Sequence, residues 1–172
     1  MKAVCSIIGH TDVYDVDIQS KMQAAVDQLV AEHETVEFLV YPNGALSSAF
    51  LLAALRARTN CPQKITISFV SLHGVVERMG SQDRAYFYIS DQLVIADIQV
   101  PKTNDGAILY KKMLLWITQN STHIISYFYD MLYDPDRQLV KHARMPDISL
   151  STPETETAIL EAAVHMTEKE QI

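Results

Sequence analysis

The chain has 172 residues, of which 48% are hydrophobic and 20% are charged. This length suits one domain with its own core, since roughly 100 to 200 residues per domain is usual, and we expect a single domain over residues 1–172. The formal net charge of -7 argues against direct nucleic-acid binding, which depends on lysine and arginine contacts to phosphates.

Simple counts exclude further classes of protein. Two cysteines, Cys5 and Cys61, are too few for a disulfide framework, and the six histidines lack the spacing of metal ligands. No stretch approaches the roughly 18 apolar residues of a membrane span, and the amino-terminal apolar run is shorter than that of a signal peptide. We therefore expect a cytoplasmic protein with no metal site, no cofactor and no membrane partner.

Short apolar runs alternate with helical patterns along the chain. In the first half we expect a strand over 3–9, a helix over 15–33, a strand over 36–41, a helix over 45–57 and a strand over 64–72. In the second half we expect a helix or loop over 74–90, a short strand over 92–99, a helix over 107–120, a strand over 122–129, a short helix ending near 144, a strand over 147–151 and a helix over 152–169. This alternation predicts an α/β fold: a Rossmann-like three-layer sandwich with a mainly parallel sheet of about five strands in the order 3-2-1-4-5.

That strand order reverses between the strand over 3–9 and the strand over 122–129. Ligands of open α/β sheets bind beyond the carboxyl ends of the strands at such a point. We therefore predict ligand contacts from Gly9, His10, Thr11 and Tyr129. His10 and Asp130 are also candidate acid–base groups. The alternative for His10 is a solvated loop position, and the alternative for Asp130 is solvation with helix capping.

The stretch "FLVYPNGALSSAFLLAAL", residues 38–55, joins a strand to a helix through a Pro-Asn-Gly turn. Helix N-terminal amides attract anions, so Asn43, Gly44 and Ser47 are predicted ligand-binding residues beside the same crevice. The alternative is a plain turn, in which Gly44 supplies a positive φ and the serine begins the helix. Both interpretations remain open at this point, because the stretch lacks the full glycine motif of a dinucleotide or phosphate-binding loop.

Two helices carry packing predictions. The helix over 107–120 is expected to bury Ile108, Met113, Leu115 and Trp116. The helix over 45–57 is apolar on more than one face, so either the rest of the domain or a partner subunit covers it. The second alternative predicts a homo-oligomer.

Three stretches together resemble a short bacterial branch of the SLOG superfamily: "VCSIIGHTDVY", "VEFLVYPNGALSSAFLLAAL" and "WITQNSTHIISYFYD". These Rossmann-like proteins are related to the LOG phosphoribohydrolases and to DprA. Gly9 and His10 match the family's first motif, and Asn120-Ser121 matches its last. Thr11 and Thr122 stand where the family often has arginine and aspartate, and Met113-Leu114 stands where an Arg-Asn pair is frequent. The Pro-Gly-Gly-x-Gly-Thr loop of the LOG enzymes is absent from the sequence.

The resemblance implies a protein that binds a nucleotide or a nucleotide-derived small molecule, in the manner of a sensor. Because the departures remove groups that would hold phosphate or cleave a glycosidic bond, we expect binding rather than catalysis. The first alternative is a nucleotide N-glycosidase or hydrolase of the LOG type, with His10 or Asp130 as the acid–base group. The second is a non-catalytic oligomeric interaction protein.

Overall fold

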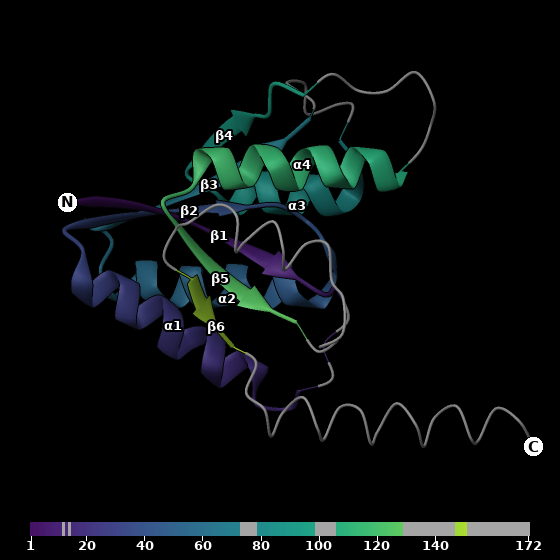
Figure 1. The fold of residues 1–172 in the computed structure, drawn as a ribbon. Coiled ribbons are helices and arrows are strands. Elements are labelled where there is room, and N and C mark those ends of the chain that lie inside the picture. Colours follow the sequence, from purple (N-terminus) through teal and green to yellow (C-terminus); the bar gives the residue numbers. More distant parts are fainter. Residues whose placement is uncertain (12, 14, 73–78, 99–105, 129–146, 151–172) are drawn as a thin grey trace, which may run out of the picture.

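The computed structural model describes residues 1–11, 13, 15–72, 79–98, 106–128 and 147–150. Its strands are β1 (Lys2–Gly9), β2 (Thr35–Val40), β3 (Ile65–Ser71), β4 (Gln92–Ile95), β5 (His123–Tyr127) and β6 (Asp147–Ser149). Its helices are α1 (Ile18–Glu32), α2 (Gly44–Asn60), α3 (Ser81–Ile89) and α4 (Gly106–Asn120). All strands belong to one parallel sheet in the order β4-β3-β2-β1-β5-β6, with helices on both faces (Figure 1).

The predicted α/β fold is confirmed, with one difference in the strand order. The five strands expected in the order 3-2-1-4-5 lie as β3, β2, β1, β5 and β6. The short strand expected within 92–99 is β4, which extends the sheet by pairing with the outer side of β3. The reversal between β1 and β5 is therefore where it was expected. The helices predicted near 144 and over 152–169 lie outside the described residues.

Alternation along the strands divides the core into two layers. Alternate strand residues such as Cys5, Phe38 and Ile67 pack with α1, α2 and Tyr86 of α3. Their neighbours on the other face, such as Ile8 and Leu39, pack with α4. Figure 1 shows α1 and α2 on one side of the sheet and α4 on the opposite side. Both faces of the central strands are thus covered, which explains their continuous apolar runs.

The predicted buried face of α4 is correct in part. Met113 and Trp116 are half-buried and pack against the core, as expected. Ile108 and Leu115, which were also expected to be buried, are 42% and 47% exposed, and Leu114 and Ile117 are buried instead. The prediction was wrong for Ile108 and Leu115 because apolar residues occur on almost every side of this helix, so their spacing does not define the buried face.

The helix α2 is covered mainly by its own domain. Leu46, Phe50 and Ala54 are buried in the core that α2 shares with α1 and the sheet, and Leu52 is 40% exposed. The apolar composition that motivated the homo-oligomer prediction is therefore largely explained within the chain. The homo-oligomer stays a prediction.

The strands β1 and β5 leave no room for a side chain where β1 ends. Gly9 is paired with Tyr127 of β5, and the amide of His10 donates a hydrogen bond to the Tyr127 carbonyl at 3.0 Å. A Cβ atom built on Gly9 would lie 2.0 Å from that carbonyl oxygen. No side chain fits at this distance, so only glycine lets β1 and β5 stay paired at this end.

A buried carboxylate lies on the α4 face of the sheet, in the half nearer the amino ends of the strands. Glu37 accepts hydrogen bonds from Ser68 at 2.6 Å and from Gln92 at 2.9 Å, and it forms an ion pair with Lys2 at 2.8 Å. Burial alone would raise the pKa of Glu37, but these hydrogen bonds and the charge of Lys2 together hold that pKa below its ordinary value of 4.5. This network links β1, β2, β3 and β4.

The close contact at Gly9 predicts that Gly9→Ala destabilises the protein by about 3 kcal/mol, because the new methyl group must push the backbone of β5 away. The matched control is Gly80→Ala, since no atom lies within 4 Å of a Cβ built at Gly80. Urea unfolding of both variants measures the difference. Equal stability of the two variants would contradict the contact.

The Glu37 network predicts a specific pH dependence. The folded-state pKa is lowered, so the stabilisation is complete above about pH 4.5 and is lost as the pH falls through the lower folded-state pKa. Glu37→Gln keeps an acceptor but removes the ion pair, so we expect a loss of about 1–3 kcal/mol at pH 7.

The difference in unfolding free energy between wild type and Glu37→Gln should shrink as the pH falls from 6 to 3, and urea titrations at constant ionic strength measure it. Glu32→Gln changes an exposed carboxylate of α1 and serves as the control, with an expected effect within about 0.5 kcal/mol at pH 7. If the difference in unfolding free energy between wild type and Glu37→Gln does not change with pH, the role assigned to the Glu37 carboxylate is contradicted.

Candidate functional site

The carboxyl ends of β1 and β5 lie side by side at the point where the strand order reverses. The loop that follows β1 then packs against the start of α2. The carbonyl of Thr11 accepts a hydrogen bond from the amide of Ala45 at 3.0 Å. The structure therefore brings Gly9, His10 and Thr11 together with the Asn43-Gly44 turn, as the sequence predicted.

The start of α2 shows features of a turn. Gly44 has a φ of +73°, and a Cβ atom there would lie 2.8 Å from the Thr11 carbonyl oxygen. Asn43 occupies the N-cap position without a side-chain capping hydrogen bond. Because Thr11 already accepts from Ala45, one amide of the predicted anion cradle is used within the protein. Glycine is thus required at position 44 for its conformation and for the close approach of Thr11.

The other predicted contact residues differ in accessibility. His10 is half-buried rather than solvated, and its ring meets that of Phe128 edge to face with 5.7 Å between centroids. Ser47 is only 3% exposed, so its side chain lies inside the domain. Tyr129 and Asp130 lie outside the described residues, and their assignments stay predictions.

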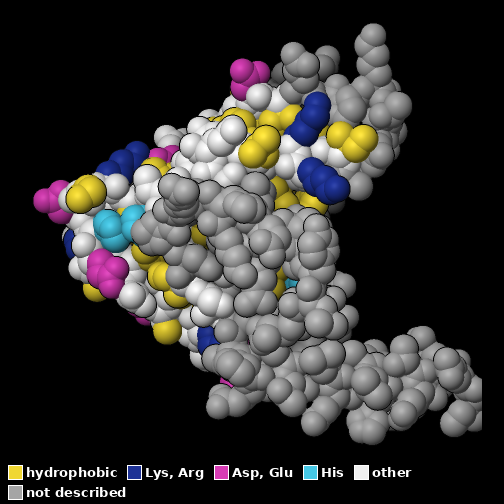
Figure 2. Space-filling model, viewed as in Figure 1, with side chains coloured by type: hydrophobic (Ala, Val, Ile, Leu, Met, Phe, Trp, Pro, Cys, Tyr) yellow, Lys and Arg dark blue, Asp and Glu magenta, His cyan; other side chains and the backbone are white. Residues whose placement is uncertain are grey.

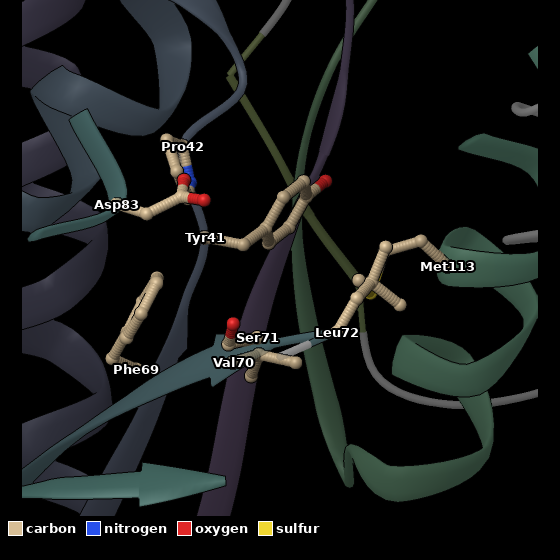
Figure 3. Close-up of a pocket in the computed structure, with 8 residues that line it drawn as sticks. All are labelled: Tyr41, Pro42, Phe69, Val70, Ser71, Leu72, Asp83 and Met113. Carbon is tan, nitrogen blue, oxygen red and sulfur yellow. The ribbon is translucent and has the colours of Figure 1, made fainter. Parts of the chain in front are cut away.

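A cavity that the sequence did not reveal opens at the carboxyl ends of β2 and β3. It has a volume of about 160 Å³ and lies between the strand ends, α3 and α4 (Figure 3). Its walls are formed by Tyr41, Pro42, Phe69, Val70, Ser71, Leu72, Asp83 and Met113. Pro42 is followed directly by Asn43 and Gly44, so this cavity adjoins the start of α2.

The cavity combines apolar walls with one acidic group. The Tyr41 hydroxyl donates a hydrogen bond to the Ile7 carbonyl at 3.3 Å, which ties this aromatic wall to β1. Asp83 belongs to the first turn of α3, and its carboxylate is directed toward Tyr41 and Pro42 in Figure 3. An apolar pocket with a few converging polar groups is the usual form of a small-molecule site. The sequence contains only a weak indication of this cavity, because the pattern over residues 74–90 predicted either a helix or a loop and so did not place Asp83.

Two histidines, His33 and His123, lie in contact at the amino edge of the sheet. The rings of His33 and His123 meet edge to face at 4.7 Å. Burial, together with the nearby His33, lowers the pKa of His123, although Glu32 acts in the opposite direction. Among the described residues no three histidine, cysteine or acidic side chains are arranged to hold a metal ion. This pair therefore offers no metal centre within that part of the chain.

The outer surface of the molecule also carries grooves, away from the cavity at the strand ends. Open grooves follow the junction of α1 with α2, where Gln23, Asp27 and Arg56 lie, and the junction of β4 with α4. Figure 2 shows hydrophobic side chains beside lysine or arginine side chains over α4. None of the helices in the described part of the chain has both the length and the apolar composition needed to cross a membrane.

A scan against protein-family models and a search of curated proteins both find no match to this chain. The likeness to the SLOG superfamily therefore rests on the short motifs alone and stays a prediction. The structure establishes the α/β fold and the arrangement of the carboxyl edge, and neither depends on that resemblance.

The positive φ at Gly44 predicts that Gly44→Ala lowers the unfolding free energy by about 1 kcal/mol or more, because alanine resists this conformation and its methyl group meets Thr11. Thermal and urea unfolding measure the loss. A variant as stable as the wild type would contradict the required turn.

Proposed function

We propose that this protein binds a nucleotide or a nucleotide-derived ligand at the carboxyl edge of its sheet. The observation that supports this most strongly is the reversal of strand order between β1 and β5, which is the usual ligand position in open α/β sheets. The loop after β1, the start of α2 and the cavity at the ends of β2 and β3 all lie along this edge.

The chemical character of this edge suits a ligand with a polar and an apolar part. The start of α2 offers the positive end of a helix dipole, which favours an anionic group such as a phosphate. His10 lies at the end of β1 and is half-buried, so it is in place to contact such a group. The neighbouring cavity offers aromatic and aliphatic walls, which favour a base. A nucleotide combines both parts.

Binding is proposed in preference to turnover. The enzymatic alternative depends on His10 or Asp130 as an acid–base group, and Asp130 lies outside the described residues. The contacts of His10 with the ring of Phe128 and with the Tyr127 carbonyl need no catalytic role. Among the residues that the structure describes, no specific contact favours the interaction-protein alternative either.

A panel of nucleoside mono- and diphosphates tests this function by thermal shift and calorimetry on the full chain. A ligand at about 100 times its Kd stabilises the folded state by about 2.7 kcal/mol, which raises the Tm by roughly 5–10 °C in a domain of this size. We expect at least one nucleotide to have this effect. His10→Ala should weaken its binding, whereas His33→Ala, at the amino edge, should leave it unchanged.

Absence of any shift across the panel at millimolar ligand would refute the proposed function. Equal effects of the two histidine variants would instead show that the ligand does not contact the end of β1.

A further inference from the structure

The cavity at the ends of β2 and β3 contains a carboxylate with an unused hydrogen-bonding capacity. Asp83 is half-buried and lines the cavity. Within the part of the chain that the structure describes, its carboxylate forms no hydrogen bond and no ion pair. An acidic side chain in the first turn also interacts favourably with the helix dipole. That role needs no cavity, whereas here the carboxylate faces one (Figure 3).

The other walls make the cavity suitable for a flat, uncharged ring. Phe69, Val70 and Leu72 come from the end of β3, and Met113 reaches in from α4. The ring of Tyr41 forms a further wall, and its hydroxyl is hydrogen-bonded to Ile7. Aromatic rings and a methionine thioether pack well against planar ligands. Asp83 therefore offers a hydrogen-bond acceptor at the margin of a space whose other walls, apart from Ser71, are mainly apolar.

The size of the cavity restricts the ligand. Its volume of about 160 Å³ is below the range of roughly 300–1,000 Å³ that holds a whole drug-sized ligand. An apolar cavity of about 150 Å³ is known to hold one benzene molecule. The space between these walls thus fits one six-membered ring, and the rest of a larger ligand extends beyond it.

We infer that this cavity binds the base of the nucleotide and that the base is an aminopyrimidine, cytosine among the common bases, whose exocyclic amine donates a hydrogen bond to Asp83. This inference rests on the proposed function. An acidic side chain accepts from the cytosine amine, whereas uracil presents a carbonyl oxygen at the same position and would place two acceptors face to face. A purine has a second ring, for which a space of about 160 Å³ leaves little room between the walls.

The position of the cavity agrees with this orientation. Pro42 lines the cavity and leads directly to the start of α2, so the sugar and phosphate extend toward the helix N-terminus. The negative charge of Asp83 repels a phosphate and excludes the reverse orientation, with phosphate inside the cavity. The base end and the phosphate end of the site are thereby distinguished by charge.

Calorimetry on the full chain with cytidine, uridine and guanosine 5′-monophosphates tests the inference. A hydrogen bond to a charged group supports a preference of about 10-fold or more, so we expect cytidine monophosphate to bind at least that much more tightly than uridine monophosphate. Guanosine monophosphate should also bind more weakly than cytidine monophosphate. Tighter binding of either competitor would overturn the inference while leaving the proposed function in place.

Asp83→Asn provides the second test, since its amide can donate to the uracil carbonyl. We expect this variant to bind cytidine monophosphate about 10-fold more weakly and to lose or reverse the preference over uridine monophosphate. The matched control is Asp97→Asn, which removes an exposed carboxylate that follows β4 and lines a different groove. Thermal unfolding confirms that both variants are folded.

An unchanged preference in Asp83→Asn would overturn the role of Asp83 even if nucleotides bind. If Asp83→Asn does not fold, the relative affinities of the wild-type protein for cytidine and uridine monophosphates still test the inference. Failure of every nucleotide to bind would overturn the proposed function and this inference with it.

Discussion

The close contact of β1 with β5 at Gly9 is the constraint on which the carboxyl edge of this protein depends. With any other residue at position 9, a Cβ atom would collide with the carbonyl of Tyr127 and separate the two strands. The strand order reverses at this pair, so the contact also fixes where the loop after β1 leaves the sheet. That loop carries the Thr11 carbonyl onto the start of α2, where it meets Ala45 and the left-handed Gly44. Two glycines and one backbone hydrogen bond thus hold the loop after β1 against the start of α2.

Polar groups have different roles at the two ends of the sheet. In the half nearer the amino ends, Glu37 is fully engaged by Ser68, Gln92 and Lys2, which joins four strands and stabilises the ionised carboxylate. At the carboxyl end, Asp83 faces a cavity without a partner among the described residues. A buried polar group that is fully hydrogen-bonded contributes to stability, whereas one left available near an apolar pocket is suited to a ligand. This difference adds to the reversal of strand order in support of the site proposed at the carboxyl edge.

The sequence predicted the structure best where burial or backbone conformation restricts which residue types can occur. Continuous apolar runs such as the one around Cys5 predicted strands covered on both faces, and the Asn43-Gly44 pair predicted a turn with positive φ. The buried face of α4 could be predicted only in part, because Ile108, Leu114 and Leu115 are similarly apolar and only contact with the sheet selects among them. The cavity could not be predicted, because its walls come from separate elements whose side chains meet only after folding. For the same reason, nothing in the sequence joined Glu37 to its partners.

An NMR titration of the uniformly ¹⁵N-labelled protein with cytidine monophosphate tests the central claim most directly, because it locates the ligand without any substitution. We expect the shifted amides to lie along the carboxyl edge, in Gly9–Thr11, Tyr41, Asn43–Ala45, Ser71, Leu72 and Asp83. Amides at the amino edge, such as those of His33 and Lys64, should keep their positions. Shifts confined to the groove between α1 and α2, around Gln23, Asp27 and Arg56, would contradict a site at the carboxyl edge.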